Sequence, residues 1–292
     1  MSAPAPAREP LGVVGAGRLG AVLGAAWRAA GHPITAVSVR SAAARDRAAL
    51  LLPGVPVVAD PADVVRAAGI VLLAVPDDAL PSVARTLAAP ARPGQVFVHP
   101  SGASGLAVLA PLATAGAARV ALHPAMTFTG TPADLPRLAG CPVAVTADEA
   151  VGSLAERLVS DLGGRPVRLA EEQRVAYHAA LCHAANHLVT LVAQAQDVLA
   201  ATGIEDPSVL LRPLLEAVLA NTLRLGDQAL TGPVSRGDTG TVRGHLAALD
   251  AIDGEVGRTY RDLAAATARR AGRMGRITAE QVAELTELVL RR

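Results

Sequence analysis

Short apolar runs alternate with segments of helical pattern over the first 170 residues. The run 70–75 is apolar at every position, which is typical of a strand buried on both faces of a sheet. The Ala- and Leu-rich segment 19–30 ends at Gly31, a helix stop signal, and a second helix is predicted over 61–68. Strands that alternate with helices predict a parallel, doubly wound α/β sheet of the Rossmann type. The predicted strands are 11–14, 34–39, 55–59, 70–75, 95–98, 119–122, 143–146 and 166–169.

Strand patterns stop near Ala170, and helical patterns continue to the end of the chain. Long helices are predicted over 174–202 and 208–226, and shorter ones begin near 241, 255 and 278. We therefore predict three regions. These are a loose tail at 1–10, a Rossmann domain at 11–170, and an all-helical domain at 171–292 for substrate binding and homodimerisation.

The amino-acid composition mainly excludes some classes of protein and of partner. Hydrophobic residues make up 51% of the 292 positions, which is enough for packed cores and too many for a disordered chain. A net charge of +1 and 2% aromatic residues give no basis for a nucleic-acid or acidic-membrane partner. Two cysteines, Cys141 and Cys182, cannot form a disulfide framework or a Cys-rich zinc site. Residues 1–10 lack the apolar stretch of a signal peptide, and no apolar run could span a bilayer, so a cytoplasmic protein is expected.

The chain contains no lysine, so all 27 basic residues are arginine. Arginine stays protonated at any working pH, which excludes Schiff-base chemistry and acid catalysis by lysine. Proton transfer near neutral pH is therefore expected from His, Asp, Glu, Cys, Tyr or water.

A glycine-rich turn follows the first predicted strand and opens the first predicted helix, which predicts a dinucleotide site. Gly15 permits the tight turn, Gly17 lets the backbone approach a pyrophosphate, and Gly20 lets helix and strand pack closely. The helix N-terminus then offers free N–H groups to the phosphates. The alternative is a tight turn with no ligand. The G-x-G-x-x-G sequence consists of Gly15, Ala16, Gly17, Arg18, Leu19 and Gly20.

The end of the second strand favours NADP(H) over NAD(H). NAD-binding folds usually carry an acidic residue about 20 residues after the glycines, and none occurs between Gly20 and Asp46. Arg40 occupies this place, where its guanidinium could bind a 2′-phosphate, with Ser38 and Ser41 as hydroxyl donors. The alternative is a solvated Arg40 at a strand end.

Val75 and Pro76 follow the fourth strand, and we expect them to flank the cofactor. Ligands of open α/β sheets bind beyond the carboxyl ends of the strands. Asp77 comes next and either shares this position or caps the following helix.

The fifth and sixth strands both end in a His-Pro pair, at His99 and His123. Each histidine alone is more typical of a structural loop residue than of a catalyst. Ser101, two residues after His99, is expected at the cofactor.

The predicted helix 174–202 carries a polar cluster from Tyr177 to His187. At about 100° per residue, Asn186 lies about 80° from His178, so the two can share a face, and His187 points away from His178. His183 and His187 have the spacing of a metal-binding pair, but a third ligand is lacking and no metal is predicted. The alternative for these histidines is a helix surface or a dimer interface.

A loop dense in turn residues, 231–240, places Arg236 and Asp238 two positions apart, and His245 follows on the next helix. Arg236 could clamp a substrate carboxylate. The alternative is a self-contained turn in which Asp238 caps the next helix.

Several stretches together resemble a bacterial family of Rossmann-like proteins whose C-terminal half is a domain of unknown function. The resemblance runs from about Leu11 to the last helix, and its last three motifs are the specific ones. The family belongs to the group of 6-phosphogluconate, β-hydroxyacid, pyrroline-5-carboxylate and ketopantoate reductases. Some members look like non-classical ketopantoate reductases of pantothenate biosynthesis. The six motifs, in chain order, are VVGAGRLG, LLAVPDDAL, VHPSGA, ALHPAMTF, YHAALCHAANHLVTL and the paired stretch ALTGPVSRGD with TVRGHL.

This resemblance implies an NADPH-dependent reductase of 2-dehydropantoate. It implies cofactor contacts at Gly15, Gly17, Gly20 and Arg40. It also suggests a substrate cleft that contains His178, Asn186, Arg236, Asp238 and His245.

The sequence departs from the usual pattern of that group, in which a lysine precedes an asparagine on the first helix of the second domain. Asn186 has no such lysine. We hypothesise that His178 donates a proton to the developing oxyanion, that Asn186 orients the substrate, and that Arg236 binds its carboxylate. One alternative is an imine reductase of the pyrroline-5-carboxylate type. The other is a non-catalytic NADPH-binding sensor or scaffold.

Overall fold

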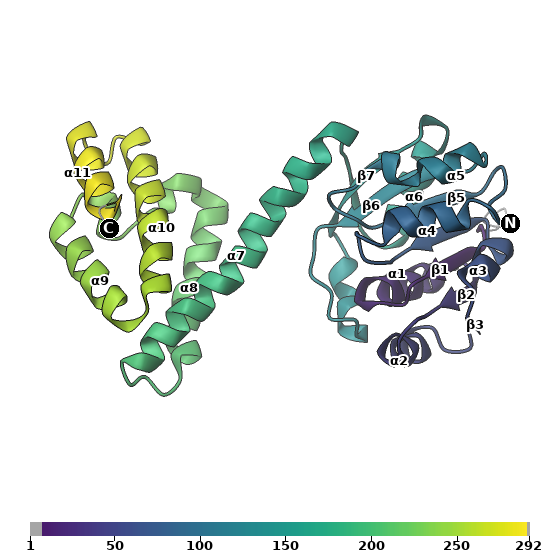
Figure 1. Cartoon of the computed structure of the whole chain (residues 1–292), viewed down its shortest axis with the longest axis horizontal. Helices are drawn as coiled ribbons and strands as arrows, with labels where there is room; N and C mark the ends of the chain where they lie inside the picture. The colour runs from purple at the N-terminus through teal and green to yellow at the C-terminus, as the bar shows by residue number, and fades with distance from the viewer. Residues whose placement is uncertain (1–7, 291–292) are drawn as a thin grey trace, which may run out of the picture. The chain divides into compact units, whose positions relative to one another are not determined.

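The computed structural model describes residues 8–290, which form two compact units that divide between His183 and Ala184 (Figure 1). This division falls inside one long helix, α7 (Arg174–Ala201), whereas the sequence places the domain boundary after residue 170. Residues 1–7 of the predicted tail lie outside the described residues. Arg8 already forms an ion pair with Asp161.

An eight-stranded sheet organises the first unit, in the order β3-β2-β1-β4-β5-β6-β7-β8. All neighbouring strands are parallel except β6 and β7, so the predicted Rossmann-type sheet is confirmed with one correction. The connection between β6 and β7 holds two short 3-10 turns instead of a crossover helix, and β7 therefore returns antiparallel. The strands are β1 (Leu11–Val14), β2 (Ile34–Ser38), β3 (Val57–Val58), β4 (Ile70–Leu73), β5 (Val96–His99), β6 (Ala118–Pro124), β7 (Pro142–Ala147) and β8 (Arg165–Arg168).

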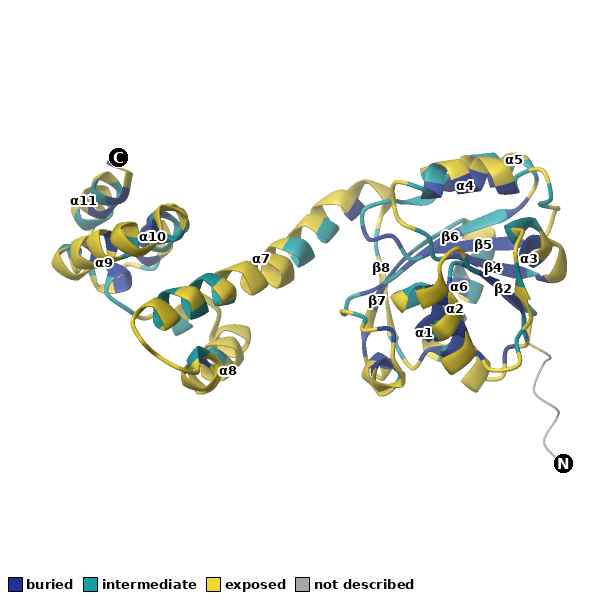
Figure 2. Cartoon of the chain, turned by 60° about the horizontal axis from the view of Figure 1, so that its bottom comes forward, coloured by how far each residue is buried: buried dark blue, intermediate teal, exposed yellow. Residues whose placement is uncertain are grey.

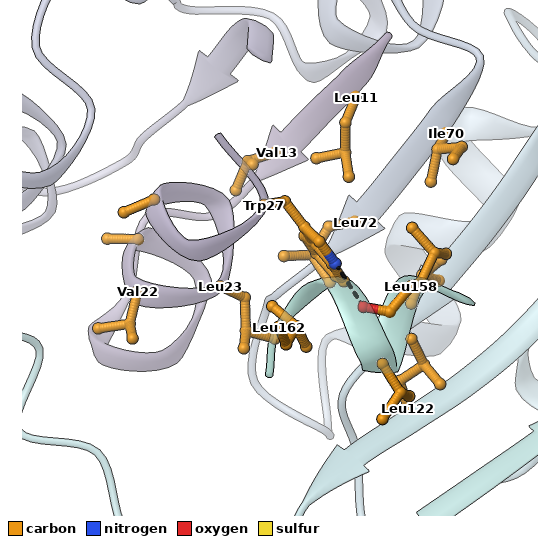
Figure 3. Close-up of a cluster of buried hydrophobic side chains, with 14 of the residues drawn as sticks. Leu11, Val13, Val22, Leu23, Trp27, Ile70, Leu72, Leu122, Leu158 and Leu162 are labelled. Atoms are coloured by element: carbon orange, nitrogen blue, oxygen red, sulfur yellow. Dashed lines mark hydrogen bonds between the residues drawn. The ribbon is translucent and has the colours of Figure 1, made fainter. Parts of the chain in front are cut away.

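Two apolar clusters, one on each face of the sheet, form the core of the first unit. In β4, Ile70 and Leu72 join one cluster while Val71 and Leu73 join the other, which explains the unbroken apolar run. On the first face, the Trp27 indole N–H donates to the Leu158 carbonyl at 2.9 Å (Figure 3). Helices α1 (Arg18–Ala29), α2 (Ala42–Leu51) and α6 (Gly152–Asp161) cover that face, and α3 (Pro61–Ala67), α4 (Leu80–Leu87) and α5 (Ala110–Thr114) cover the other.

Among the described residues, the second unit is helical throughout. Its core lies between the last three helices and includes Val242, Leu246, Ala268 and Leu285. Of the residues of α8, only Leu211 is buried. No helix within residues 8–290 combines the length and hydrophobicity that a membrane crossing requires. The helices are the second part of α7, α8 (Pro207–Leu225), α9 (Thr239–Ile252), α10 (Gly254–Arg273) and α11 (Ala279–Leu290).

Candidate active site

The glycine-rich turn joins β1 to the N-terminus of α1. Gly15 has a φ of +97°, which other residues rarely adopt, and a Cβ on Gly20 would lie 2.1 Å from the Gly15 carbonyl oxygen. Gly17 differs, because a Cβ there would meet nothing within 4 Å. Gly17 also begins α1 without a side-chain cap, so the first N–H groups of the helix remain available to an anion. Gly15 and Gly20 are therefore closely packed positions of the turn, whereas the space beside Gly17 is open.

The residues around this turn fit a dinucleotide with a 2′-phosphate. Arg40 follows β2 and is exposed, and Ser41 caps α2 by accepting a hydrogen bond from the Ala44 N–H at 3.2 Å. The Arg47 Nε–H donates to the Ala16 carbonyl at 3.4 Å, which places a further guanidinium at the turn. Sequence reasoning missed Arg47, because its role depends on how α2 packs beside the turn.

Val75 and Pro76 follow the carboxyl end of β4, where Val75 is half-buried and Pro76 is exposed. The Asp77 carboxylate accepts a hydrogen bond from the Ser101 hydroxyl at 2.8 Å. The capping alternative for Asp77 is wrong, because the N-cap of α4 is Ala79. Ser101 is itself buried, so its hydroxyl ties the ends of β4 and β5 together.

His99 has the structural role that the sequence favours. Its Nε2 lies 2.9 Å from the Gly105 carbonyl and its Nδ1 accepts the Ser101 N–H at 3.2 Å. Burial lowers the pKa of His99 to about 4, so the ring is neutral at neutral pH. Both ring nitrogens shape the loop after β5.

His123 plays a different part, because it meets two side chains of α7. Its Nδ1 lies 3.0 Å from the Tyr177 hydroxyl, and its ring stands edge-on to those of Tyr177 and His178, with centroids 5.6 and 5.9 Å away. We call His123, Tyr177 and His178 the His123 cluster. Burial, followed by the nearby His178, lowers the pKa of His123 to about 4. Burial raises the pKa of Tyr177, so its phenol is protonated at neutral pH.

The loop after β5 leaves room for this cluster at Gly102. A Cβ on Gly102 would lie 2.4 Å from His178 Cδ2 and 3.0 Å from His123 Nε2. The Sγ of Cys182, one helical turn along α7, lies 3.5 Å from His178 Nε2. His178 is therefore half-buried among groups that restrict its ring.

Arg174 holds the start of α7 against the strand ends. It is fully buried, and its Nη2 and Nη1 groups donate to the Ser101 carbonyl at 2.8 Å and the Thr146 hydroxyl at 2.9 Å. Its Nε has no hydrogen-bond partner among residues 8–290. Since Tyr177 and His178 lie one turn further along the helix, Arg174 fixes their distance from the sheet.

Glu171, just before α7, also binds the loop that follows β5. Its carboxylate accepts the N–H groups of Leu106 and Ala107 at 2.6 and 3.1 Å. Sequence reasoning missed Glu171, Arg174 and the partnership of Tyr177 with His123. The available signal was the position of Tyr177 at the head of the YHAALCHAANH stretch.

The other four predicted site residues belong to the second unit. Asn186 is exposed on α7, and Arg236 is exposed at the end of a 3-10 turn (Val234–Arg236). Asp238 caps α9 by accepting the Thr241 N–H at 3.0 Å and its hydroxyl at 2.6 Å, as in the capping alternative. These bonds lower the pKa of Asp238, and Arg236 and His245 lower it further. His245 Nδ1 lies 2.9 Å from the Tyr260 hydroxyl.

No three His, Cys, Asp or Glu side chains within residues 8–290 come together as a metal site. The candidate chemical groups of the described first unit are the imidazoles, the phenol and the guanidinium groups at the strand ends that carry the glycine-rich turn.

Two models of known families match this chain, one in each half. Residues 2–124 match the model of a Rossmann-like domain, and residues 141–267 match a domain of unknown function, DUF2520. The chain combines a Rossmann-like domain with a DUF2520 domain. The expected pairing of a Rossmann-like domain with a C-terminal domain of unknown function is thus confirmed. No curated protein matches the sequence.

Solved structures share the fold of this chain along almost its whole length. Protein BF3122 from Bacteroides fragilis, provisionally assigned as an NADP oxidoreductase, has 22% identity and a TM-score of 0.77, over 90% of this chain and 98% of that chain. Protein TM1727 from Thermotoga maritima has 22% identity and a TM-score of 0.69, over 91% and 99%. An imine reductase from Myxococcus stipitatus in complex with NADP+ has 21% identity and a TM-score of 0.64, over 94% and 99%. At these identities the likeness establishes the fold.

Proposed function

We propose that this protein is an NADPH-dependent oxidoreductase that reduces a carbonyl or imine carbon of a small molecule. The proposal rests on the observation that the glycine turn and the His123 cluster lie at the same edge of the sheet. The glycine turn follows β1 and the His123 cluster lies at the end of β6, with β4 and β5 between them. Three strand spacings of about 4.8 Å separate the two, on the order of 14 Å. Dinucleotides bind across the strand ends at such a switch in strand order.

The turn would hold the pyrophosphate at Gly17 and the N-terminus of α1. Arg40 and Ser41 would bind the 2′-phosphate, and the absence of an acid at this strand end favours the phosphorylated coenzyme. Bound NADPH would supply the hydride. On the side of β4 and β5, Val75, Pro76 and Ser101 would lie along the nicotinamide half.

The His123 cluster would supply the proton. His178 keeps the role of general acid, because histidine is the side chain that most often transfers protons in catalysis near neutral pH. Tyr177 is a second donor to a developing oxyanion. If the neutral His123 donates its Nδ1–H to the phenol oxygen, the Tyr177 O–H is free to point at the substrate. Arg174 and Glu171 position this donor pair rather than react.

The preferred substrate is a 2-oxo acid, with 2-dehydropantoate as the first choice. Arg236 is proposed to bind the carboxylate and Asn186 to orient the carbonyl. The positive charges of Arg236 and His245 both act on Asp238, which supports a role for that loop. The second candidate is imine reduction. It is supported by fold similarity to the Myxococcus stipitatus imine reductase and to an Aspergillus terreus reductive aminase in complex with NADPH.

Steady-state assays with NADPH separate these candidates. Turnover of 2-dehydropantoate that falls in a His178→Asn variant supports the first, and turnover of pyrroline-5-carboxylate that is indifferent to this change supports the second. An imine product forms without an oxyanion and needs less from an acid. Tight NADPH binding with no oxidation by any carbonyl or imine compound would instead support the sensor alternative.

A homodimer through the helical domain is also proposed. The second unit exposes many large apolar side chains, and a contiguous apolar surface on a protein favours association. A symmetric dimer would use the same surface on both copies. The exposed apolar residues of α7 and α8 in this unit include Leu188, Val189, Leu191, Val209, Leu210, Leu214, Val218, Leu219 and Leu223.

A further inference from the structure

The segment after β4 connects the glycine turn to the loop after β5. Its first residue, Ala74, packs directly on the turn, because a Cβ on Gly15 would lie 2.4 Å from the Ala74 carbonyl oxygen. Three residues later in the sequence, the Asp77 carboxylate accepts a hydrogen bond from the Ser101 hydroxyl at 2.8 Å. Asp77 is exposed, so its carboxylate is accessible at the carboxyl ends of the strands.

Ser101 holds the Asp77 carboxylate in a defined position. Ser101 is buried, and its hydroxyl oxygen accepts the Ser104 N–H at 3.1 Å, which leaves the hydroxyl hydrogen for Asp77. The Arg174 Nη2 group donates to the Ser101 carbonyl at 2.8 Å and fixes the backbone at the same residue. Asp77 is therefore an exposed carboxylate that is attached to a rigid part of the first unit.

No cation neutralises this carboxylate inside the first unit. Among residues 8–290, no arginine or histidine forms an ion pair with Asp77. Its charge acts instead on two imidazoles. Burial lowers the pKa values of His99 and His123, and the Asp77 carboxylate opposes this lowering. A carboxylate without a counter-cation therefore lies near the proposed proton donors.

Hydride transfer changes the charge of a nicotinamide coenzyme at one end only. The dihydronicotinamide ring of NADPH is neutral. When its C4–H bond breaks, both electrons of that bond leave with the hydride for the substrate carbon, and the ring that remains is a cation. A fixed negative charge near this ring stabilises the oxidised form relative to the reduced one.

We propose that Asp77 faces the nicotinamide half of the bound coenzyme and favours NADP+ relative to NADPH at this site. The strand order supports this placement, because Arg40 follows β2 on one side of β1 and Asp77 follows β4 on the other. A dinucleotide that lies across the strand ends extends to both sides of its pyrophosphate. With its 2′-phosphate at Arg40, its nicotinamide extends toward Asp77. This inference rests on the proposed function, because it concerns the same coenzyme.

Binding of the two redox forms tests the inference without turnover. Calorimetric titrations of the full-length protein with NADP+ and with NADPH give the ratio of their dissociation constants, NADP+ over NADPH. Asp77→Asn keeps the shape of the side chain and removes its charge, so this ratio should rise about three- to tenfold. Asp78→Asn is the matched control, because Asp78 is the exposed neighbour that Ser101 does not hold, and it should leave the ratio unchanged.

Two further measurements separate charge from shape and one half of the coenzyme from the other. Asp77→Glu retains the carboxylate and should keep most of the wild-type ratio. The nucleotide 2′,5′-ADP carries the phosphorylated adenosine half without nicotinamide. It should bind to the wild type and to Asp77→Asn with the same affinity.

Three outcomes would overturn the inference and leave the proposed function intact. One is an Asp77→Asn variant that binds both coenzymes with the wild-type ratio. Another is an equal loss of affinity for NADP+ and NADPH, which would give Asp77 a role in holding the loop or a ribose. The third is weaker binding of 2′,5′-ADP to Asp77→Asn, which would place Asp77 at the adenosine half. A wild-type chain that binds neither coenzyme would overturn both proposals.

Discussion

The two units of this chain use apolar residues in opposite ways. In the first unit, every residue of β1, β4 and β5 is buried, so the sheet and its helices complete a core without help. In the second unit, α8 is coloured as exposed over most of its length (Figure 2). Leu211 is its one buried residue, and Leu223 of α8 and Val189 of α7 are 81% and 71% exposed. The first unit thus encloses its apolar side chains in a core, whereas the second leaves many of them on its surface.

The largest effect is expected from removing the proton donors of the first unit. Tyr177→Phe or His178→Asn should lower kcat by about 10²- to 10⁴-fold, the range that general acid catalysis contributes. The same change at His187→Asn, in the second unit, serves as the control and should have a much smaller effect. Wild-type turnover in both first-unit variants, measured with saturating NADPH, would show that the chemistry does not reside there.

Shortening an apolar side chain should lower the free energy of unfolding far more in the first unit than on the surface of the second. Leu158→Ala in the first unit should cost about 2–5 kcal/mol of unfolding free energy, because it removes side-chain volume from a closed core. Leu223→Ala on α8 should change the free energy of dilute protein by less than about 0.5 kcal/mol. Urea titrations followed by circular dichroism compare the two, and equal losses would contradict the difference in packing.

Acid should destabilise the first unit through two histidines. The pKa values of His99 and His123 are lowered from 6.5 to about 4 in the folded chain, so the unfolded chain binds more protons between these values. Stability should therefore be constant above about pH 7 and fall as the pH drops from about 6.5 to 4, by up to about 3 kcal/mol for each histidine. Trp27, the only tryptophan, reports this unfolding by fluorescence. A stability that stays flat across this window would mean that the rings are not held neutral.

The smallest expected effect concerns the surface of the second unit. Leu223→Glu should raise the dissociation constant of a homodimer at least about tenfold, because the charge would be buried against the second copy. Leu50→Glu, at a 59% exposed position of α2, is the matched control and should leave it unchanged. Sedimentation velocity measures both. A wild-type chain that stays monomeric at high concentration would remove the dimer from the account.

Local sequence patterns were sufficient for most of the fold. The apolar run 70–75 and the stop at Gly31 depend on neighbouring residues only, and the structure places a strand and a helix end there. The antiparallel β7 could not be predicted in this way. Its direction depends on a connection without a crossover helix, and short strands of either direction have the same apolar pattern.

The candidate site was predictable where it depends on a local motif and not where it depends on distant contacts. The glycine turn is visible as a motif. Nothing in the sequence distinguishes Arg174 from the other arginines, because its partners Ser101 and Thr146 come close to it only in the folded chain. His123 likewise looks like a loop histidine until Tyr177, 54 positions later, meets its ring. Such roles arise from burial, which a single sequence does not display.

The central claim is that the first unit holds a phosphorylated nicotinamide coenzyme at the open Gly17 turn. Calorimetric titration of the full-length protein with NADPH and, separately, NADH tests it most directly. We predict saturable binding of NADPH, at least about tenfold tighter than that of NADH, because Arg40 forms a charge-assisted contact with the 2′-phosphate. Folded protein that binds neither coenzyme would contradict the claim.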